Sequence, residues 1–373
     1  MVEVKSFRKA TIPTNLLSNP SPGNIQSTRL DLHVSGDGST CSVYIASGSR
    51  VYKIEIFMED LMVSQGKDNL LIPIPAQIKH SSMLDRCPHR SEIKSVVLAA
   101  GEGETRLILG TVDSFGHLIV SQLETNGEDA GDDSDIDSLS YSVLPHECGV
   151  GEGSWAGVCF SPRHWSTAAV VHSFGKTINV YDQDILFRNL HTLWYPHCLS
   201  FFQSSVLGGD GSSVLAVGEG SQLSIWDLRT KENGGCVQRI CGSIGDNIYA
   251  VSCSPSGPIA IGGSNRTVTI YDPRRWRSLS RWVHCCKYEV TNLSFSSIDP
   301  NFIYIQGVDY EVICGQWKNK EKTFSFKGDS NWVGFSKCGQ QRDVVGGWCD
   351  SGSIFIAEVL NKWDGEDCSG KNK

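Results

Sequence analysis

Two short peptides combine an aromatic residue, an aspartate and an arginine in the same order. They are Trp226-Asp227-Leu228-Arg229 and Tyr271-Asp272-Pro273-Arg274, and their aromatic residues lie 45 positions apart. A guanidinium binds carboxylates and carbonyl oxygens through two parallel hydrogen bonds, so the arginines are candidates for binding a partner protein. The alternative is local, with the aspartates accepting hydrogen bonds from nearby backbone amides and the arginines solvated.

The second peptide continues into a cationic stretch that contains two tryptophans. Its members are Arg274, Arg275, Trp276, Arg277, Arg281, Trp282 and Lys287. Arginine beside tryptophan is enriched at the energetic centres of protein interfaces, and the same pair contacts phosphate or RNA. We favour a simpler interpretation, in which the charges lie on the solvated face of an outer strand. The candidate partner-binding residues are Trp226, Asp227, Arg229, Tyr271, Asp272, Arg274, Arg275 and Trp276.

The sequence offers little for metal binding or catalysis. His284-Cys285-Cys286, Cys87 with His89, and His197-Cys198 bring soft metal ligands together, but no CxxC pair has the spacing of a structural zinc site. The chain also lacks a GxSxG nucleophile elbow and a phosphate-binding loop. We therefore expect no catalytic residue, no metal site, no cofactor and no enzymatic activity.

The composition is that of a packed globular protein. Of 373 residues, 40% are hydrophobic and 20% charged, with 38 glycines, 10 tryptophans and 14 cysteines. The N-terminus lacks the apolar core of a signal peptide, and no apolar run is long enough to span a membrane, so we expect reduced thiols and an intracellular protein of the nucleus or cytoplasm. Most of the net charge of −8 lies in the acidic residues of 124–138, and the remainder is nearly neutral, which does not favour nucleic-acid binding.

A strand pattern recurs along the chain. Aligned anchor positions are Ile54, Ser121, Tyr181, Trp226, Tyr271, Trp317 and Ala357, at spacings of 67, 60, 45, 45, 46 and 40 residues. Each anchor follows two apolar runs and a turn rich in Gly, Asn or Asp, and a period of about 40–45 residues is typical of propeller blades. The two long spacings contain the acidic segment and the segment KDNLLIPIPAQIKHSSMLDRCPHR, which we interpret as loops between repeats.

The repeats resemble the WD40-repeat family over roughly residues 28–360. Ile225-Trp226-Asp227, Ile270-Tyr271-Asp272 and Val180-Tyr181-Asp182 carry the resemblance, each at the end of a repeat's third strand. It implies an all-β, seven-bladed propeller. The two peptides that end in Arg229 and Arg274 also resemble the WDxR box of substrate receptors of cullin-RING ubiquitin ligases. That resemblance implies arginines on one rim of the disc that dock on an adaptor of the ligase.

The two ends of the chain suggest how the propeller closes. After Glu358 too few residues follow to complete a four-stranded blade, so the N-terminal segment VEVKSFRKATI is expected to supply the last strand and remove an exposed sheet edge. The expected organisation is an N-terminal arm at 1–27, a propeller at 28–360 with the acidic loop at 124–138, and a polar tail at 361–373.

We interpret the protein as a non-enzymatic interaction scaffold within a multi-subunit complex, with other proteins as its partners and a cullin-RING adaptor as the specific hypothesis. A structural subunit of a nuclear, mRNA-export or nuclear-pore type of assembly is the alternative, and it predicts indifference to Arg229. A propeller hydrolase is a third hypothesis from another class, and it predicts acidic and histidine side chains along the central channel. We expect neither a membrane nor nucleic acid as a direct ligand.

Overall fold

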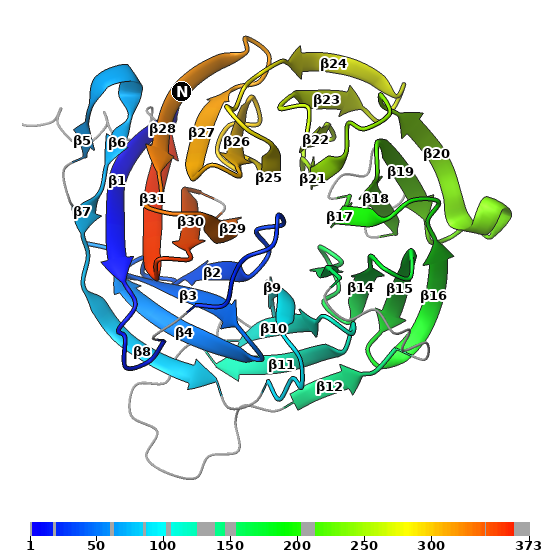
Figure 1. Cartoon of the computed structure of the whole chain (residues 1–373), viewed down its shortest axis with the longest axis horizontal. Coiled ribbons are helices and arrows are strands. Elements are labelled where there is room, and N and C mark those ends of the chain that lie inside the picture. The colour runs from blue at the N-terminus through cyan, green and yellow to red at the C-terminus, as the bar shows by residue number, and fades with distance from the viewer. Residues whose placement is uncertain are drawn as a thin grey trace, which may run out of the picture.

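A computed structural model describes residues 2–17, 20–59, 63–84, 87–101, 106–124, 139–145, 154–202, 213–339 and 341–361. Seven sheets are arranged as blades around a central axis (Figure 1). The expectation of an all-β, seven-bladed propeller is therefore confirmed. The acidic segment lies outside the described residues, apart from Glu124 at the end of β11.

Each blade has four strands that run from the channel to the rim. Blade 1 contains β2 (Leu30–Val34), β3 (Thr40–Ser47), β4 (Arg50–Phe57) and β8 (Ile78–Leu84). Blade 2 contains β9 (Ile93–Ala100), β10 (Arg106–Asp113), β11 (Leu118–Glu124) and β12 (Leu139–Val143). Blade 3 contains β13 (Ala156–Phe160), β14 (Thr167–His172), β15 (Thr177–Asp182) and β16 (Ile185–His191).

The remaining blades repeat this order. Blade 4 contains β17 (Pro196–Phe201), β18 (Val214–Glu219), β19 (Gln222–Asp227) and β20 (Cys236–Cys241). Blade 5 contains β21 (Ile248–Cys253), β22 (Ile259–Gly263), β23 (Val268–Asp272) and β24 (Arg277–Trp282). Blade 6 contains β25 (Val290–Phe295), β26 (Phe302–Gly307), β27 (Glu311–Gln316) and β28 (Glu321–Lys327), and blade 7 contains β29 (Trp332–Cys338), β30 (Asp343–Cys349), β31 (Ser353–Asn361) and β1 (Val2–Thr11).

The burial pattern explains why the two middle strands of a blade are apolar. All residues of β18 are buried, because both faces of this strand pack against neighbouring blades. The outer strand β16 instead exposes most of its residues to solvent at the rim. The core therefore consists of wedges between blades, such as the one that Val171 and Val180 of blade 3 form with Leu215 and Trp226 of blade 4.

The N-terminal strand closes the ring, as the sequence predicts. Strand β1 pairs antiparallel with β31 along its whole length and becomes the outer strand of blade 7 (Figure 1). Phe7 is fully buried in this blade, with its ring centroid 4.8 Å from that of Phe326 and 6.0 Å from that of Phe355. Arg8 and Lys5 both lie close to the buried carboxylate of Glu358, which also pairs with Arg342 at 2.6 Å.

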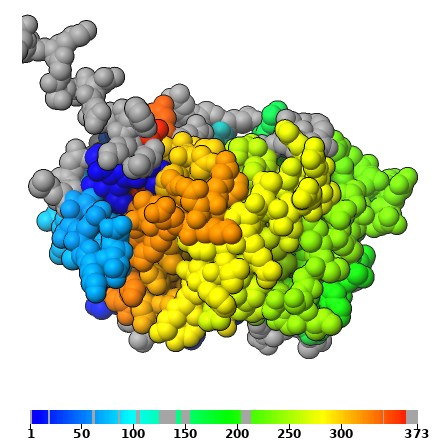
Figure 2. All heavy atoms as spheres, turned by 90° about the horizontal axis from the view of Figure 1, so that it is seen from above, coloured from blue at the N-terminus to red at the C-terminus, as the bar shows by residue number. Residues whose placement is uncertain are grey.

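The segment after β4 is more ordered than a loop, so that part of our interpretation was wrong. Ile78–Leu84 forms the fourth strand of blade 1, and β7 (Ile74–Pro75) pairs in parallel with β1. A short hairpin of β5 (Ser64–Gln65) and β6 (Leu71–Ile72) lies between β4 and β7 in the sequence. This hairpin contacts blade 6, where the side chain of Asn69 donates a hydrogen bond of 3.0 Å to the carbonyl of Thr323. Figure 2 shows this light-blue segment against the orange outer strand of blade 6 on the rim. It covers the edge that β1 would otherwise expose.

The connection from β1 to blade 1 passes through the central channel, where Figure 1 shows it as a dark-blue loop. The carbonyls of Ser27 and Thr28 accept hydrogen bonds from the backbone of Phe335 in blade 7 and of Val96 in blade 2. The hydroxyl of Thr28 accepts a bond of 3.2 Å from the indole of Trp155 in blade 3. This segment thus links blade 7 to blades 2 and 3 across the channel.

We predict that Phe7→Ala weakens the whole ring. Removing a fully buried phenylalanine leaves a cavity and should lower the free energy of unfolding by about 3–5 kcal/mol. Urea denaturation followed by tryptophan fluorescence measures this change. Glu3→Ala on the exposed side of the same strand is the control, and an equal, small effect of both variants would show that β1 does not stabilise the propeller.

Candidate functional site

The predicted arginines lie in equivalent turns of adjacent blades. Arg229 follows β19 and Arg274 follows β23, so both occupy the turn between the third and fourth strands of their blades. Because successive strands alternate in direction, these turns and those between first and second strands share one face of the disc. We call this face the arginine face and the opposite one the aromatic face.

The aspartate of each peptide organises its own turn. Asp227 accepts a hydrogen bond of 2.9 Å from the backbone amide of Arg229, and Asp272 accepts the equivalent bond of 2.9 Å from Arg274. Arg229 also returns to Asp227 through Nε at 2.9 Å and Nη2 at 2.7 Å. The hydrogen bond from the Arg229 side chain holds the pKa of Asp227 below its ordinary value. The local alternative that we considered therefore describes the aspartates, while both arginines remain exposed to solvent.

The other predicted site residues differ in exposure. Trp226 is 1% exposed and packs in the wedge between blades 3 and 4, where its indole donates to Ser224 at 2.9 Å. Tyr271 and Trp276 are half-buried and pack at the interface of blades 4 and 5, whereas Arg275 is exposed. The structure therefore brings Arg229, Arg274 and Arg275 to one surface, and it places the aromatic residues behind them.

Further cations extend this surface. The turn after β19 also carries Lys231, and the corresponding turn of blade 6 carries Lys318 and Lys320, all exposed. Together with the arginines they form what we call the cationic arc: Arg229, Lys231, Arg274, Arg275, Lys318 and Lys320. Arg188 of blade 3 stabilises the turn that contains Arg229. Its guanidinium donates hydrogen bonds to the carbonyl of Leu228 at 2.7 Å and to that of Thr230 at 2.6 Å. The sequence repeats were sufficient to locate two of these turns, but not the contribution of blade 6.

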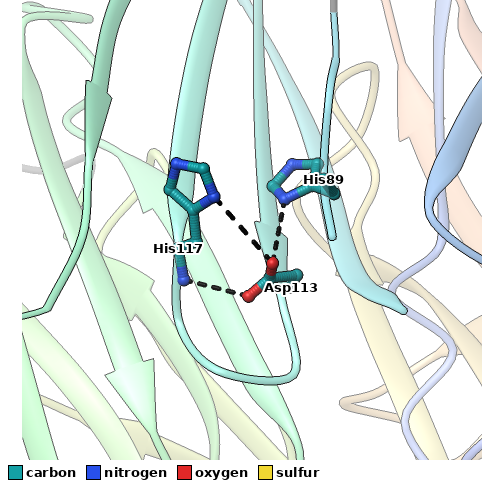
Figure 3. A group of neighbouring side chains, drawn as sticks. All are labelled: His89, Asp113 and His117. Atoms are coloured by element: carbon teal, nitrogen blue, oxygen red, sulfur yellow. Dashed lines mark hydrogen bonds and ion pairs between the residues drawn. The ribbon is translucent and has the colours of Figure 1, made fainter. Parts of the chain in front are cut away.

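A second cluster, which the sequence did not reveal, lies on blade 2. Asp113 ends β10, His89 precedes β9 and His117 precedes β11, and their potential ligand atoms lie within 4.8 Å of one another (Figure 3). Asp113 Oδ2 lies 3.2 Å from His89 Nδ1 and 4.0 Å from His117 Nδ1. Asp113 and His117 are four positions apart, but His89 lies 24 positions before Asp113 and no spacing motif joins it to them, so only the folded blade brings the three together.

Hydrogen bonds account for the geometry of this cluster. His89 Nε2 lies 2.8 Å from the Thr111 hydroxyl, and His117 Nε2 lies 2.6 Å from that of Ser142. Burial raises the pKa of Asp113, but hydrogen bonds from His89 and from the His117 amide outweigh it and hold the pKa below its ordinary value. Burial lowers the pKa of His117, and the charge of His89 lowers it further. The three residues could ligate a divalent cation, and without one they connect the strands of blade 2 as a polar network.

The hydrolase hypothesis predicts acidic and histidine side chains along the central channel, and the lining of a cavity there can be compared with it. A cavity of about 140 Å³ lies beside the channel-crossing segment. Its lining contains Gln26, Thr28, His197, Tyr249 and Asn292 together with small and apolar residues, and no carboxylate among the described residues. Burial lowers the pKa of His197. This lining differs from the cluster of acids that a propeller hydrolase requires.

The described cysteines are all free, and no helix in the described part of the chain has the length and apolar character to cross a membrane. Cys41, Cys253 and Cys314 are buried in strands, and Cys159 is half-buried. Burial raises the pKa of Cys253 to about 12, so this thiol stays protonated.

The blades, the ring closure and the repeated aspartate turns define a seven-bladed β-propeller. No protein-family model matches the chain, and no curated protein sequence matches it significantly. Among solved structures, Saccharomyces cerevisiae Sqt1 is similar, with a TM-score of 0.56 and 16% sequence identity over 88% of this chain and 83% of that chain. At this identity the likeness shows the fold alone.

We predict a pH-dependent loss of stability through His172, at the end of β14. Its Nε2 is buried without a hydrogen-bond partner in the described structure, and burial lowers the pKa of its imidazole to about 4. The unfolded chain binds this proton near pH 6.5 whereas the folded chain binds it only near pH 4, so stability falls as the pH drops through this window. The loss amounts to about 3 kcal/mol at most.

Urea denaturation of the wild type and of His172→Gln between about pH 7 and about pH 4 measures this effect. The variant should lose less stability over the window than the wild type. His80→Gln makes the same substitution at an exposed position and should retain the wild-type pH dependence. Equal losses in the wild type and His172→Gln would contradict the assignment.

Proposed function

We propose that this protein is an interaction subunit of a multi-protein complex that docks through its arginine face. The cationic arc carries this proposal, because three consecutive blades present six exposed Lys and Arg side chains from equivalent turns. Among the described residues, the exposed acids that lie next to these cations in the sequence are Glu232 and Glu321. The two aspartates that hold the turns are half-buried, so positive charge predominates. The complementary surface of a partner is therefore acidic.

The ion pair between Arg229 and Asp227 is compatible with docking. Exposed ion pairs contribute about 0–1 kcal/mol, and the side chain of Arg229 is 45% exposed. Exchanging the contact with Asp227 for a carboxylate or carbonyl of the partner therefore costs little. The partner that best matches the two WDxR-like peptides is an adaptor of a cullin-RING ubiquitin ligase, and on this proposal the propeller is the substrate receptor of that ligase.

We predict that the double variant Arg229→Ala, Arg274→Ala loses its adaptor. Arginines at the centre of an interface contribute about 1–2 kcal/mol or more each, so the affinity should fall by about 30-fold to 1,000-fold. Affinity purification of the intact protein followed by mass spectrometry detects this loss. Arg277→Ala, Arg281→Ala removes two exposed arginines from the outer strand of blade 5 and is the matched control. Circular dichroism establishes that both variants are folded.

Two results would overturn the receptor proposal. One is a wild-type complex without any ligase component, and the other is an adaptor that both double variants retain. A stable set of partners that is indifferent to Arg229 and includes no ligase component would favour the alternative function, a structural subunit of a nuclear or mRNA-export type of assembly.

A further inference from the structure

Large apolar side chains are exposed together on the aromatic face of blades 2, 3 and 4. They are Phe115, Phe174, Leu193, Trp194 and Tyr195, with exposed fractions from 40% for Phe115 to 58% for Leu193. Phe115 and Phe174 occupy the turns between the second and third strands of blades 2 and 3, and the other three connect blade 3 to blade 4. We call this group the aromatic patch. Contiguous exposed apolar surface of this kind marks an interaction site.

The members of the patch are held close together. Phe115 and Phe174 line the same groove. Lys176, from the turn that contains Phe174, places its Nζ 4.7 Å from the ring centroid of Tyr195. The carbonyl of Lys176 accepts a hydrogen bond of 2.8 Å from the amide of Thr192, immediately before Leu193. The patch is therefore one surface across neighbouring blades.

A buried carboxylate fixes the backbone beneath the exposed side chains. Glu219 is fully buried, and its Oε2 accepts hydrogen bonds from the amides of Leu193 at 2.6 Å and Trp194 at 3.0 Å. Its Oε1 pairs with Arg239 at 2.7 Å, which neutralises its charge. Gly220 adopts a φ of +54°, and a Cβ there would lie 3.1 Å from that of Trp194. Because the backbone of this connection is already held in place, binding through its apolar side chains loses little backbone entropy.

The groove beside the patch has room for one side chain. Its volume is about 200 Å³, and Phe115, Phe174, Leu186, Trp155 and His172 contribute to its lining. Pockets that enclose small-molecule ligands usually measure about 300–1,000 Å³. The lining also contains hydroxyl and amide side chains, among them Ser154, Asn179 and Asn189. The size suits one anchor residue of a peptide better than a cofactor, with the apolar rings contacting its side chain and the polar groups available to the peptide backbone.

The charges around the patch favour an acidic partner. The ammonium of Lys176 contacts the ring of Tyr195. Arg90 is exposed and lies near His117, whose pKa is lowered first by burial, then by the charge of His89, and also by the charge of Arg90. The carboxylates of Asp113 and Glu219 beside the patch are buried and already paired within the protein. Glu92, in the same connection as Arg90, is partly exposed and pairs with Arg29 and Lys94. Among the described residues, the acids of these segments are therefore neutralised within the protein, and the positive charge of Lys176 is available to a partner.

We propose that the aromatic patch binds a short extended segment of a partner protein, in which an apolar anchor residue occupies the groove and a neighbouring Asp or Glu pairs with Lys176. The proposal rests on the proposed function as an interaction subunit and assigns it a second site, on the face opposite the cationic arc. The geometry is that of a receptor that holds its assembly on one face and its target on the other.

Selection of phage-displayed random dodecapeptides on the immobilised full-length protein tests this proposal. The expected result is enrichment of peptides with a large apolar residue beside an Asp or Glu. Fluorescence polarisation with the synthetic peptides should then show a loss of affinity of about tenfold or more for Trp194→Ala. Lys176→Glu should weaken binding of the acidic peptides and favour variants of them with Lys in place of the acid. Leu279→Ala, an equally exposed apolar residue on the rim of blade 5, is the matched control.

The opposite results would overturn the proposal. They are selection without enrichment, enriched peptides that lack an acidic residue, and peptides that bind Trp194→Ala as well as they bind the wild type. Binding of phosphatidylcholine and phosphatidylserine vesicles by the wild type but not by Trp194→Ala would show that the patch is a membrane-contact surface instead. None of these outcomes depends on Arg229 or Arg274, so failure here and failure of the adaptor purification are distinguishable.

Discussion

The pairing of β1 with β31 is the interaction on which the propeller depends. Each wedge of core lies between two blades, so an open ring would leave blade 7 without its outer strand and would loosen its contacts with blades 1 and 6. Phe7 and Ala10 of β1 contribute to these two wedges from a single strand. The relative positions of the cationic arc and the aromatic patch follow from the closed ring, because both surfaces consist of turns whose places are set by the number and order of the blades.

Local sequence was sufficient to predict much of the fold. Trp226 lies in β19, in which five of six residues are buried, and Tyr271 lies in β23, in which buried and half-buried residues alternate. Such strands appear in the sequence as apolar or alternating runs bounded by turn residues. The N-terminal strand was predictable because an unpaired edge is unfavourable in any sheet. Strand β8 was not, because Pro73, Pro75, Ser81 and Ser82 give its surroundings the composition of a loop, and only pairing with β4 makes it a strand.

Among the candidate sites, those formed by local sequence could be predicted and those formed by long-range contacts could not. The turns that present Arg229 and Arg274 are local structures, since each aspartate accepts from the amide two residues ahead, and they could be predicted from their peptides. The exposure of Trp194 could not, because it depends on Glu219, which lies 25 residues further along the chain and turns the backbone inward. The cluster of His89 and Asp113 likewise depends on pairing between strands of one blade.

The separation between β1 and its partner has a consequence for biosynthesis. Ser6 and Glu358 are 352 positions apart, so β1 is synthesised long before β31 and remains without this partner in the meantime. Until then β1 is an unpaired strand with an apolar face, and the segment that crosses the channel lacks the blades it will join. Closing so long a loop costs conformational entropy before it gains any contact, which makes ring closure a late step in folding. The nascent chain therefore has to keep its N-terminal strand from pairing elsewhere, and molecular chaperones that shield exposed strands are expected to act on that segment first.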